Sequence, residues 1–344
     1  MKELAGTVEG LHRYQKATPA ECHALFKKLL QDRATQQLKY KNRFIEGANP
    51  KRPAYLQFST VAHKENSLTA KTIFHEGLLK DQDGIYWIVK KFNPGARDDK
   101  DPREPRNSPR YERLAYLLAR DRANYAEIRL QQGGTYLTRA VTAANLDITT
   151  LPQRNVSDAF SAILVANVFM RKWDQHLNNY AYSGDIPVSI DHDVIGPPTT
   201  FPHSSKGVST FDLAFLSFKV ITAISYLRPP HAVDAKARER LKYHFVRQND
   251  REAWGVMRDL LFGLGLGAGL IRAEGLRIAG LRRSILAFKT AGPIDRLAEE
   301  SGFRGRELDA IAGYLTQSQK RLGTDVGHIW RCLSGENTRL NELD

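Results

Sequence analysis

Hydrophobic and polar positions divide the chain into a helical start, a strand-rich part and a mostly helical remainder. Residues 1–40 carry leucines at helical spacings, and the sequence Thr-Pro-Ala-Glu that begins at Thr18 is typical of a helix start. Residues 41–92 hold short apolar runs, of which residues 85–89 are the clearest, separated by Gly, Pro, Asn and Asp. The pattern therefore predicts an N-terminal helical segment followed by a sheet of short strands.

The pattern becomes more helical after residue 110. Residues 111–122 and 159–170 have helical periodicity, and two short strand-like runs lie between them, near residues 126–130 and 135–140. The remainder is mostly helical and is interrupted by a polar hairpin at residues 180–195. Strands followed by a helical block predict an α+β fold. We expect a helical segment at 1–40, a small β-rich lobe at 41–140 and a large, mostly helical lobe at 141–344.

Length and composition fit a chain with a sizeable core. Hydrophobic residues make up 42% of the 344 residues, enough for one large two-lobed domain or two ordinary ones. No run of about 18 apolar residues occurs, so no transmembrane segment is expected. The first residues lack the apolar core of a signal peptide. Cys22 and Cys332 are the only cysteines, which argues against a disulfide framework and fits a reducing, cytoplasmic setting.

The formal charge of +13 allows two interpretations. A basic surface favours partners that carry phosphates, which are nucleotides, nucleic acids or acidic lipids. The basic residues are spread along the chain, however, which is equally typical of solvated Lys and Arg side chains. The densest basic stretch, residues 277–283, alternates Arg with apolar residues and predicts an amphipathic helix. Charge alone therefore does not decide the partner.

The strongest chemical pattern is a loop with acidic residues and an asparagine. Asp174 and Asn179 are five positions apart after an apolar helix, and Asp191 ends an apolar strand after a short polar hairpin. Phosphoryl transfer needs a carboxylate beside the attacking hydroxyl, and an amide oxygen and a second carboxylate that hold Mg²⁺. Asp and Asn are also common helix caps, but caps do not explain the strand that follows at hairpin distance. The spacing predicts a catalytic Asp174 and a metal site at Asn179 and Asp191.

Two residues upstream fit the same reaction. Lys90 follows the apolar run at 85–89, where alternation lets only one of Lys90 and Lys91 face a nucleotide, and Glu112 begins the next helix. In kinases a strand lysine contacts the ATP phosphates and a helix glutamate holds that lysine. Taken alone, each residue has a simpler interpretation. Lys90 can be a solvated lysine at the end of an edge strand, and Glu112 can be a first-turn glutamate that the helix dipole favours. Together with the acidic loop they predict a bilobal protein-kinase-like fold.

Three further segments have weaker interpretations. The turn at residues 47–53 can direct backbone N–H groups, Asn49 and Lys51 toward a phosphate, or it can be an ordinary Pro/Gly turn. The glycines at 263–269 lack a preceding strand, so they favour close helix packing over a dinucleotide site. Residues 297–311 resemble a helix-turn-helix, but a helix pair of the large lobe is the preferred interpretation.

With these motifs in place, the chain resembles the HipA-like kinases and, more distantly, the phosphoinositide 3/4-kinases. Both families show D-R-H-x-x-N followed by I-D-H or I-D-F-G, and the similar stretches here begin at Asp174 and Ile190. The run that ends at Lys90 looks like the Y-x-V-V-K strand of the HipA-like family. Residues 47–51 are similar to its G-A-x-P-K phosphate loop.

The resemblance implies roles for single residues. Asp174 is expected to be the catalytic aspartate, Asn179 and Asp191 the Mg²⁺ ligands, and Lys90 the contact to the ATP phosphates. The chain departs from the pattern at Gln175, which replaces Arg, and after Asp191, where His-Asp replaces Phe-Gly. A regulatory flip like that of ordinary protein kinases is therefore not implied.

The combined expectation is an ATP- and Mg²⁺-dependent phosphotransferase, a HipA-like protein serine/threonine kinase that acts on a Ser or Thr hydroxyl of a protein. Asp174 would orient or deprotonate this hydroxyl. Glu112 would hold Lys90 against the phosphates. Two alternatives stay open. One is a lipid kinase that acts on phosphoinositide head groups, which the basic charge suits, and the other is a non-catalytic module that uses its charge to bind nucleic acid.

Overall fold

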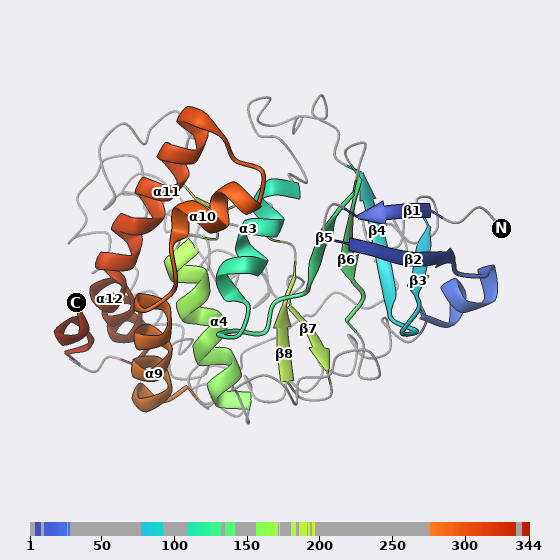
Figure 1. Cartoon of the computed structure of the whole chain (residues 1–344). Coiled ribbons are helices and arrows are strands. Elements are labelled where there is room, and N and C mark those ends of the chain that lie inside the picture. Colours follow the sequence, from blue (N-terminus) through green and yellow to red (C-terminus); the bar gives the residue numbers. More distant parts are fainter. Residues whose placement is uncertain are drawn as a thin grey trace, which may run out of the picture.

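The computed structural model describes residues 4–7, 10–25, 27, 77–91, 109–131, 135–141, 156–170, 172, 180–183, 186–190, 192, 195–196, 276–334 and 339–344. Within these ranges the chain combines an antiparallel sheet with a group of helices, which confirms the predicted α+β class. The sheet and most of the helices lie at opposite ends of the view in Figure 1, and α3 lies next to the sheet.

The larger sheet has 6 strands in the order β1-β2-β3-β4-β6-β5, and all neighbouring strands are antiparallel. The strands are β1 (Leu4–Thr7), β2 (Gly10–Lys16), β3 (Leu78–Asp81), β4 (Tyr86–Lys91), β5 (Ile128–Leu130) and β6 (Thr135–Arg139). A separate hairpin consists of β7 (Tyr180–Ser183) and β8 (Ile186–Ser189). The strand that carries Lys90, β4, therefore lies inside the sheet between β3 and β6.

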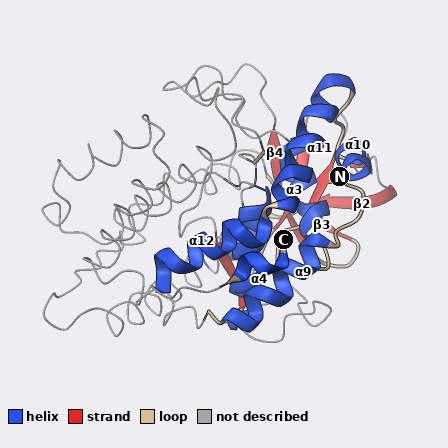
Figure 2. Cartoon of the chain, turned by 90° about the vertical axis from the view of Figure 1, so that its left-hand side faces the viewer, coloured by secondary structure: helices blue, strands red, loops and turns tan. Residues whose placement is uncertain are grey.

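The helices form a block that stands in front of the strands in Figure 2. They are α3 (Pro109–Ala119), α4 (Val156–Met170), α9 (Ile278–Lys289), α10 (Ile294–Glu300), α11 (Gly305–Lys320), α12 (Leu322–Ser334) and the 3-10 helix η5 (Leu340–Leu343). Residues 159–170 of α4 are all buried, and this helix contacts α9, α11, α12 and β8. It forms the centre of the main core. Of the helices in the described ranges, none is both long and apolar enough to cross a bilayer.

The helical segment predicted over residues 1–40 is wrong at its start, because β1 and β2 are strands. They pair with each other, and β2 also pairs with β3. Alternation explains β2, since Tyr14 is buried while the residues on either side of it are exposed. Helical structure begins only after Thr18, over residues 19–25, where the predicted helix start is confirmed.

Most other elements follow the prediction. The run before Lys90 forms β4, the helix expected at 111–122 is α3, and the two strand-like runs after it are β5 and β6. The polar hairpin is β7–β8, and the amphipathic helix expected at 277–283 belongs to α9. The short strand β3 was not predicted. Residues 41–76, where further strands were predicted, lie outside the described residues.

The side chains on the two faces of β4 have different neighbours. On one face Trp87 is fully buried, the Arg129 guanidinium lies 3.9 Å from its ring centre, and its indole N–H donates to Asp81 at 2.9 Å. Alternation places Ile88 and Lys90 on the other face. Lys90 thereby points toward α3, where its ammonium meets a carboxylate.

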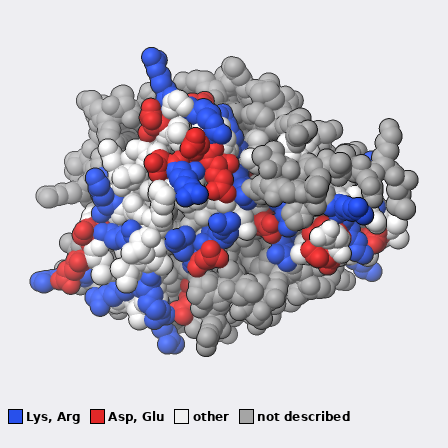
Figure 3. All heavy atoms as spheres, viewed as in Figure 1, with Lys and Arg blue, Asp and Glu red and all other residues white. Residues whose placement is uncertain are grey.

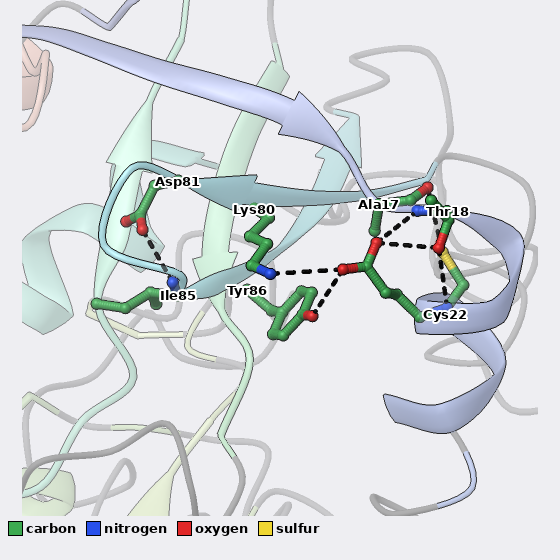
Figure 4. A network of polar contacts seen from close by, with 8 residues as sticks. Ala17, Thr18, Cys22, Lys80, Asp81, Ile85 and Tyr86 are labelled. Atoms are coloured by element: carbon green, nitrogen blue, oxygen red, sulfur yellow. Dashed lines mark hydrogen bonds and ion pairs between the residues drawn. The ribbon is translucent and has the colours of Figure 1, made fainter.

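A capping box fastens the first helix to the sheet (Figure 4). The Thr18 hydroxyl accepts the Glu21 N–H at 3.2 Å, and the Glu21 carboxylate accepts the Thr18 N–H at 2.8 Å. The other carboxylate oxygen accepts hydrogen bonds from Lys80 at 3.4 Å and the Tyr86 hydroxyl at 3.2 Å. The bonds from Thr18, first from its backbone N–H and then from its hydroxyl, lower the pKa of Glu21 below its ordinary value of 4.5.

Thr18→Ala should destabilise this helix by about 1 kcal/mol, because alanine cannot accept the Glu21 N–H. Hydrogen exchange of residues 19–25 measures the loss. Thr316→Ala, at an exposed site inside α11, is the control because it removes no cap. Unchanged exchange in Thr18→Ala would contradict the capping role.

The stabilisation of this helix by the Glu21 carboxylate should be present above pH 4.5 and lost as the pH falls through the lowered pKa of Glu21.

Candidate functional site

Lys90 and Glu112 form an ion pair where β4 meets α3. The Lys90 Nζ lies 2.8 Å from Glu112 Oε1, and the two side chains are 16% and 0% exposed. The sheet register places Lys90 opposite Tyr136 in β6, and the ammonium lies 5.7 Å from the centre of that ring. The structure therefore brings together two of the residues that the sequence pattern indicated, with the lysine partly accessible and the carboxylate buried.

The Glu112 carboxylate is held by three donors from three parts of the chain. Besides Lys90, the Tyr136 hydroxyl donates to Oε1 at 3.2 Å and the backbone N–H of His192 donates to Oε2 at 3.1 Å. A buried carboxylate must be paired and hydrogen-bonded, because water cannot solvate it. Both oxygens are used, so the group that holds Lys90 also holds the backbone of the residue after Asp191.

The first turn of α3 is anchored to other helices and to the sheet. Arg113 donates to Ile128 O at 2.7 Å and lies 3.7 Å from Glu300 Oε1 at the end of α10. Arg110 pairs with Glu307 of α11 at 2.6 Å. A shift of α3 relative to the sheet or to these two helices would break one or more of these contacts, so they help to keep its buried glutamate in place.

The end of β8 is tied to the residues that follow α3. The Ser189 N–H donates to Asn124 O at 2.8 Å, and Ser189 O accepts the Ala126 N–H at 3.0 Å, in a parallel bridge at Tyr125. The buried His192 ring stacks on Tyr125, with 4.2 Å between ring centres and 25° between ring planes. Residues 189 and 192 are thereby held against the same short segment.

A buried lysine, Lys172, contacts the same residues at the end of β8 and His192. It is 1% exposed, and its Nζ donates to Ile190 O at 2.7 Å and Ser189 Oγ at 3.3 Å and lies 3.1 Å from His192 Nδ1. Because an ammonium only donates, Nδ1 accepts, and the imidazole proton lies on Nε2, which donates to Ser189 O at 3.1 Å. Burial, followed by the charges of Lys172 and Lys90, holds the pKa of His192 well below 6.5. The ring is therefore neutral at pH 7.

The other residues of the predicted site lie outside the described residues. They are Asp174, Asn179, Asp191, Asn49 and Lys51. Their roles stay predictions. Within the described ranges, no group of three or more His, Cys, Asp and Glu side chains is arranged to hold a metal ion.

The sequence pattern did not reveal Tyr136 or Lys172. Tyr136 contacts Glu112 because β6 pairs with β4, and this pairing between distant segments has no local sequence signal. Lys172 stands two positions before Asp174, and this nearness to the predicted catalytic residue was the sequence signal that could have pointed to it. His192 was noted as part of the I-D-H motif and as a departure from the Phe of I-D-F-G, but its ring contacts, which connect these groups, were not predicted.

Comparisons with known proteins assign the chain to no family. No family model and no curated protein matches it. Among solved structures, the proinflammatory kinase CtkA of Helicobacter pylori aligns with 78% of this chain and 92% of its own, at 9% sequence identity and a TM-score of 0.30. A similarity at this level identifies neither family nor function. The resemblance to HipA-like kinases therefore rests on the motifs alone.

Lys90→Met should destabilise the fold by about 3 kcal/mol, because it leaves the buried Glu112 carboxylate without its cation. Lys91→Met is the matched control, since it removes the neighbouring lysine and leaves both members of the Lys90–Glu112 pair in place. Urea unfolding followed by circular dichroism measures both variants. A larger loss in Lys91→Met than in Lys90→Met would show that the facing assigned to β4 is wrong.

Proposed function

We propose that this chain is an ATP-dependent phosphotransferase of the kinase type. The observation that supports it is the ion pair of Lys90 with the buried Glu112, whose carboxylate also accepts the His192 N–H at 3.1 Å. Kinases use a strand lysine held by a helix glutamate, together with an acidic segment that binds metal. Here one carboxylate links the strand lysine to the residue that follows Asp191 in the sequence.

The ion pair gives Lys90 a fixed position. A lysine ammonium is a compact charge on a flexible four-carbon stem, so a partner is needed to hold it in one place. Glu112 supplies that partner at 2.8 Å, and the 16% exposure of Lys90 leaves part of the side chain accessible to a ligand. A charge fixed before the reaction stabilises negative charge on phosphate oxygens without further reorganisation.

The proposed reaction transfers the γ-phosphoryl group of ATP to a hydroxyl. The acceptor oxygen forms a bond to the γ-phosphorus, the bond from this phosphorus to the β–γ bridging oxygen breaks, and ADP leaves. Asp174 orients the acceptor hydroxyl and takes its proton. Lys90, held by Glu112, contacts the phosphates, and Asn49 and Lys51 are proposed as further phosphate contacts.

Asn179 and Asp191 are proposed as the side chains that hold Mg²⁺. An amide oxygen and a carboxylate are hard oxygen donors of the type that Mg²⁺ prefers, and Mg²⁺ needs few protein ligands. When bound, the ion neutralises charge on the phosphates. The hydrogen bonds of Ile190 O and of the His192 N–H support this proposal, because they fix the backbone neighbours of Asp191.

A Ser or Thr hydroxyl of a protein is the proposed acceptor, as the motif similarity to HipA-like kinases suggests. On the face seen in Figure 3, basic and acidic side chains of the described residues are interspersed. An enzyme that works on acidic head groups favours a concentrated basic surface, because each basic group near the lipid adds about 1 kcal/mol. The mixture of charges on this face gives no support to the lipid alternative.

Incubation with Mg·ATP should add one or more phosphates to the chain itself or to added casein, as measured by intact mass. Asp174→Ala should reduce the rate about 10²- to 10⁴-fold, because the general base is lost. Parallel reactions with phosphoinositide vesicles test the lipid alternative. Phosphate on the lipid, lost in Asp174→Ala, would support a lipid kinase. If neither ADP nor any phosphorylated acceptor forms, the result would contradict phosphotransfer altogether.

A further inference from the structure

We propose that Lys172 is a positioning residue that holds Ser189, Ile190 and His192, the residues that come just before and just after Asp191 in the sequence. The proposal rests on the proposed phosphotransfer function. Lys172 is 1% exposed, and its ammonium reaches Ile190 O, Ser189 Oγ and His192 Nδ1 at 2.7, 3.3 and 3.1 Å. All three acceptors belong to the segment that contains Asp191.

The burial of this lysine indicates a role that depends on its hydrogen bonds. Removing an ammonium from water is expensive, and burial is tolerated only when the charge is paired or hydrogen-bonded. A methionine of similar length would fill the space without that cost. The observed bonds join two parts of the chain that are both proposed to carry reacting groups, so the ammonium has a positioning task that packing alone does not provide.

The backbone of Lys172 is itself well fixed. Its N–H donates to Asn167 O at 2.9 Å at the end of α4. Two further carbonyls of this helix end are also satisfied, because Phe169 O accepts from Ser318 Oγ at 2.7 Å and Met170 O accepts from the Gly196 N–H at 2.9 Å. Lys172 therefore extends from an anchored helix end, two positions before Asp174 in the sequence.

A closed circuit of contacts connects Lys172 to His192. The Asn167 side-chain oxygen accepts the Tyr125 hydroxyl, and the Tyr125 ring stacks on His192 at 4.2 Å. His192 Nδ1 accepts from Lys172, whose backbone returns to Asn167. Each member fixes the next, so the position of the His192 ring depends on the ammonium.

Two independent groups thus hold the backbone on either side of position 191. Lys172 holds Ile190 O at 2.7 Å, and Glu112 holds the His192 N–H at 3.1 Å. Loss of Lys172 removes one of these two contacts and leaves the Lys90–Glu112 pair intact. A small displacement of a reacting group lowers the rate of the chemical step more than it lowers substrate affinity.

The first test is Lys172→Met with Mg·ATP as substrate and ADP release as the readout. We expect kcat to fall by about 10²-fold, while KM for ATP changes by less than about threefold. Lys80→Met is the matched control, since this lysine of β3 is 40% exposed and lies outside the proposed site. Hydrogen exchange should show faster exchange of the amides of β8 and His192 in Lys172→Met.

A second variant covers the case in which Lys172→Met does not fold. His192→Phe keeps a ring against Tyr125 and keeps the backbone N–H for Glu112, but it removes the Nδ1 acceptor. It should lower kcat less than Lys172→Met, because the bond to Ile190 O remains. In the double variant the two effects on kcat should not be additive, since each single variant already removes the contact between the ammonium and Nδ1.

The outcomes separate this proposal from the proposed function. Wild-type kcat in a folded Lys172→Met, or additive effects in the double variant, would overturn the positioning role while phosphotransfer stands. If Lys172→Met does not fold, wild-type kcat in His192→Phe overturns it. If the wild-type chain itself releases no ADP, the proposed function fails. In that case hydrogen exchange still tests whether Lys172 anchors the segment after β8. Unchanged exchange of the amides of β8 and His192 in Lys172→Met would overturn this anchoring, and faster exchange would support it.

Discussion

The buried carboxylate of Glu112 is the group on which the rest of the site depends. It has no exposed surface, so its charge is tolerated only because protein donors replace water. These donors are the Lys90 ammonium, the Tyr136 hydroxyl and the His192 N–H. They come from β4, from β6 and from the segment after β8. One charge requirement therefore fixes the relative placement of three parts of the chain that are far apart in the sequence.

A second polar network lies behind the first and shares His192 with it. The imidazole is neutral, accepts from Lys172 and donates to Ser189 O, while its ring stacks on Tyr125. This explains physically why a polar ring suits a position where the I-D-F-G form of the motif has Phe. A Phe ring could stack in the same way, but it could not receive the ammonium. The segment after β8 is therefore held through both its backbone and its side chains.

The sequence predicted the parts that have local signals. The strand before Lys90, the helix of Glu112 and the hairpin of β7–β8 all have clear periodicity, and the structure contains them. The contact between Lys90 and Glu112 could be anticipated because a lysine at a strand end and a glutamate in the next helix suit one ion pair. The roles of these two residues in catalysis stay proposals.

The parts that could not be predicted depend on contacts between distant segments. β2 was taken as helical because leucine spacings around it resemble a helix, and its pairing with β3 decides otherwise. The contact of Tyr136 with Glu112 depends on the register of β6 against β4, and that of Lys172 on the packing of the α4 end against β8. Asp174 and Asp191 lie outside the described residues, so their roles rest on the motif.

The central claim is that ATP phosphates bind beside Lys90. An acyl-phosphate derivative of ATP tests this most directly, because it transfers its acyl group to an amine that lies next to the bound phosphates. Mass spectrometry of the digested protein should locate the acyl group on Lys90, and excess Mg·ATP should prevent the labelling. Labelling that ignores Mg·ATP, or that falls only on lysines other than Lys90, would contradict the account.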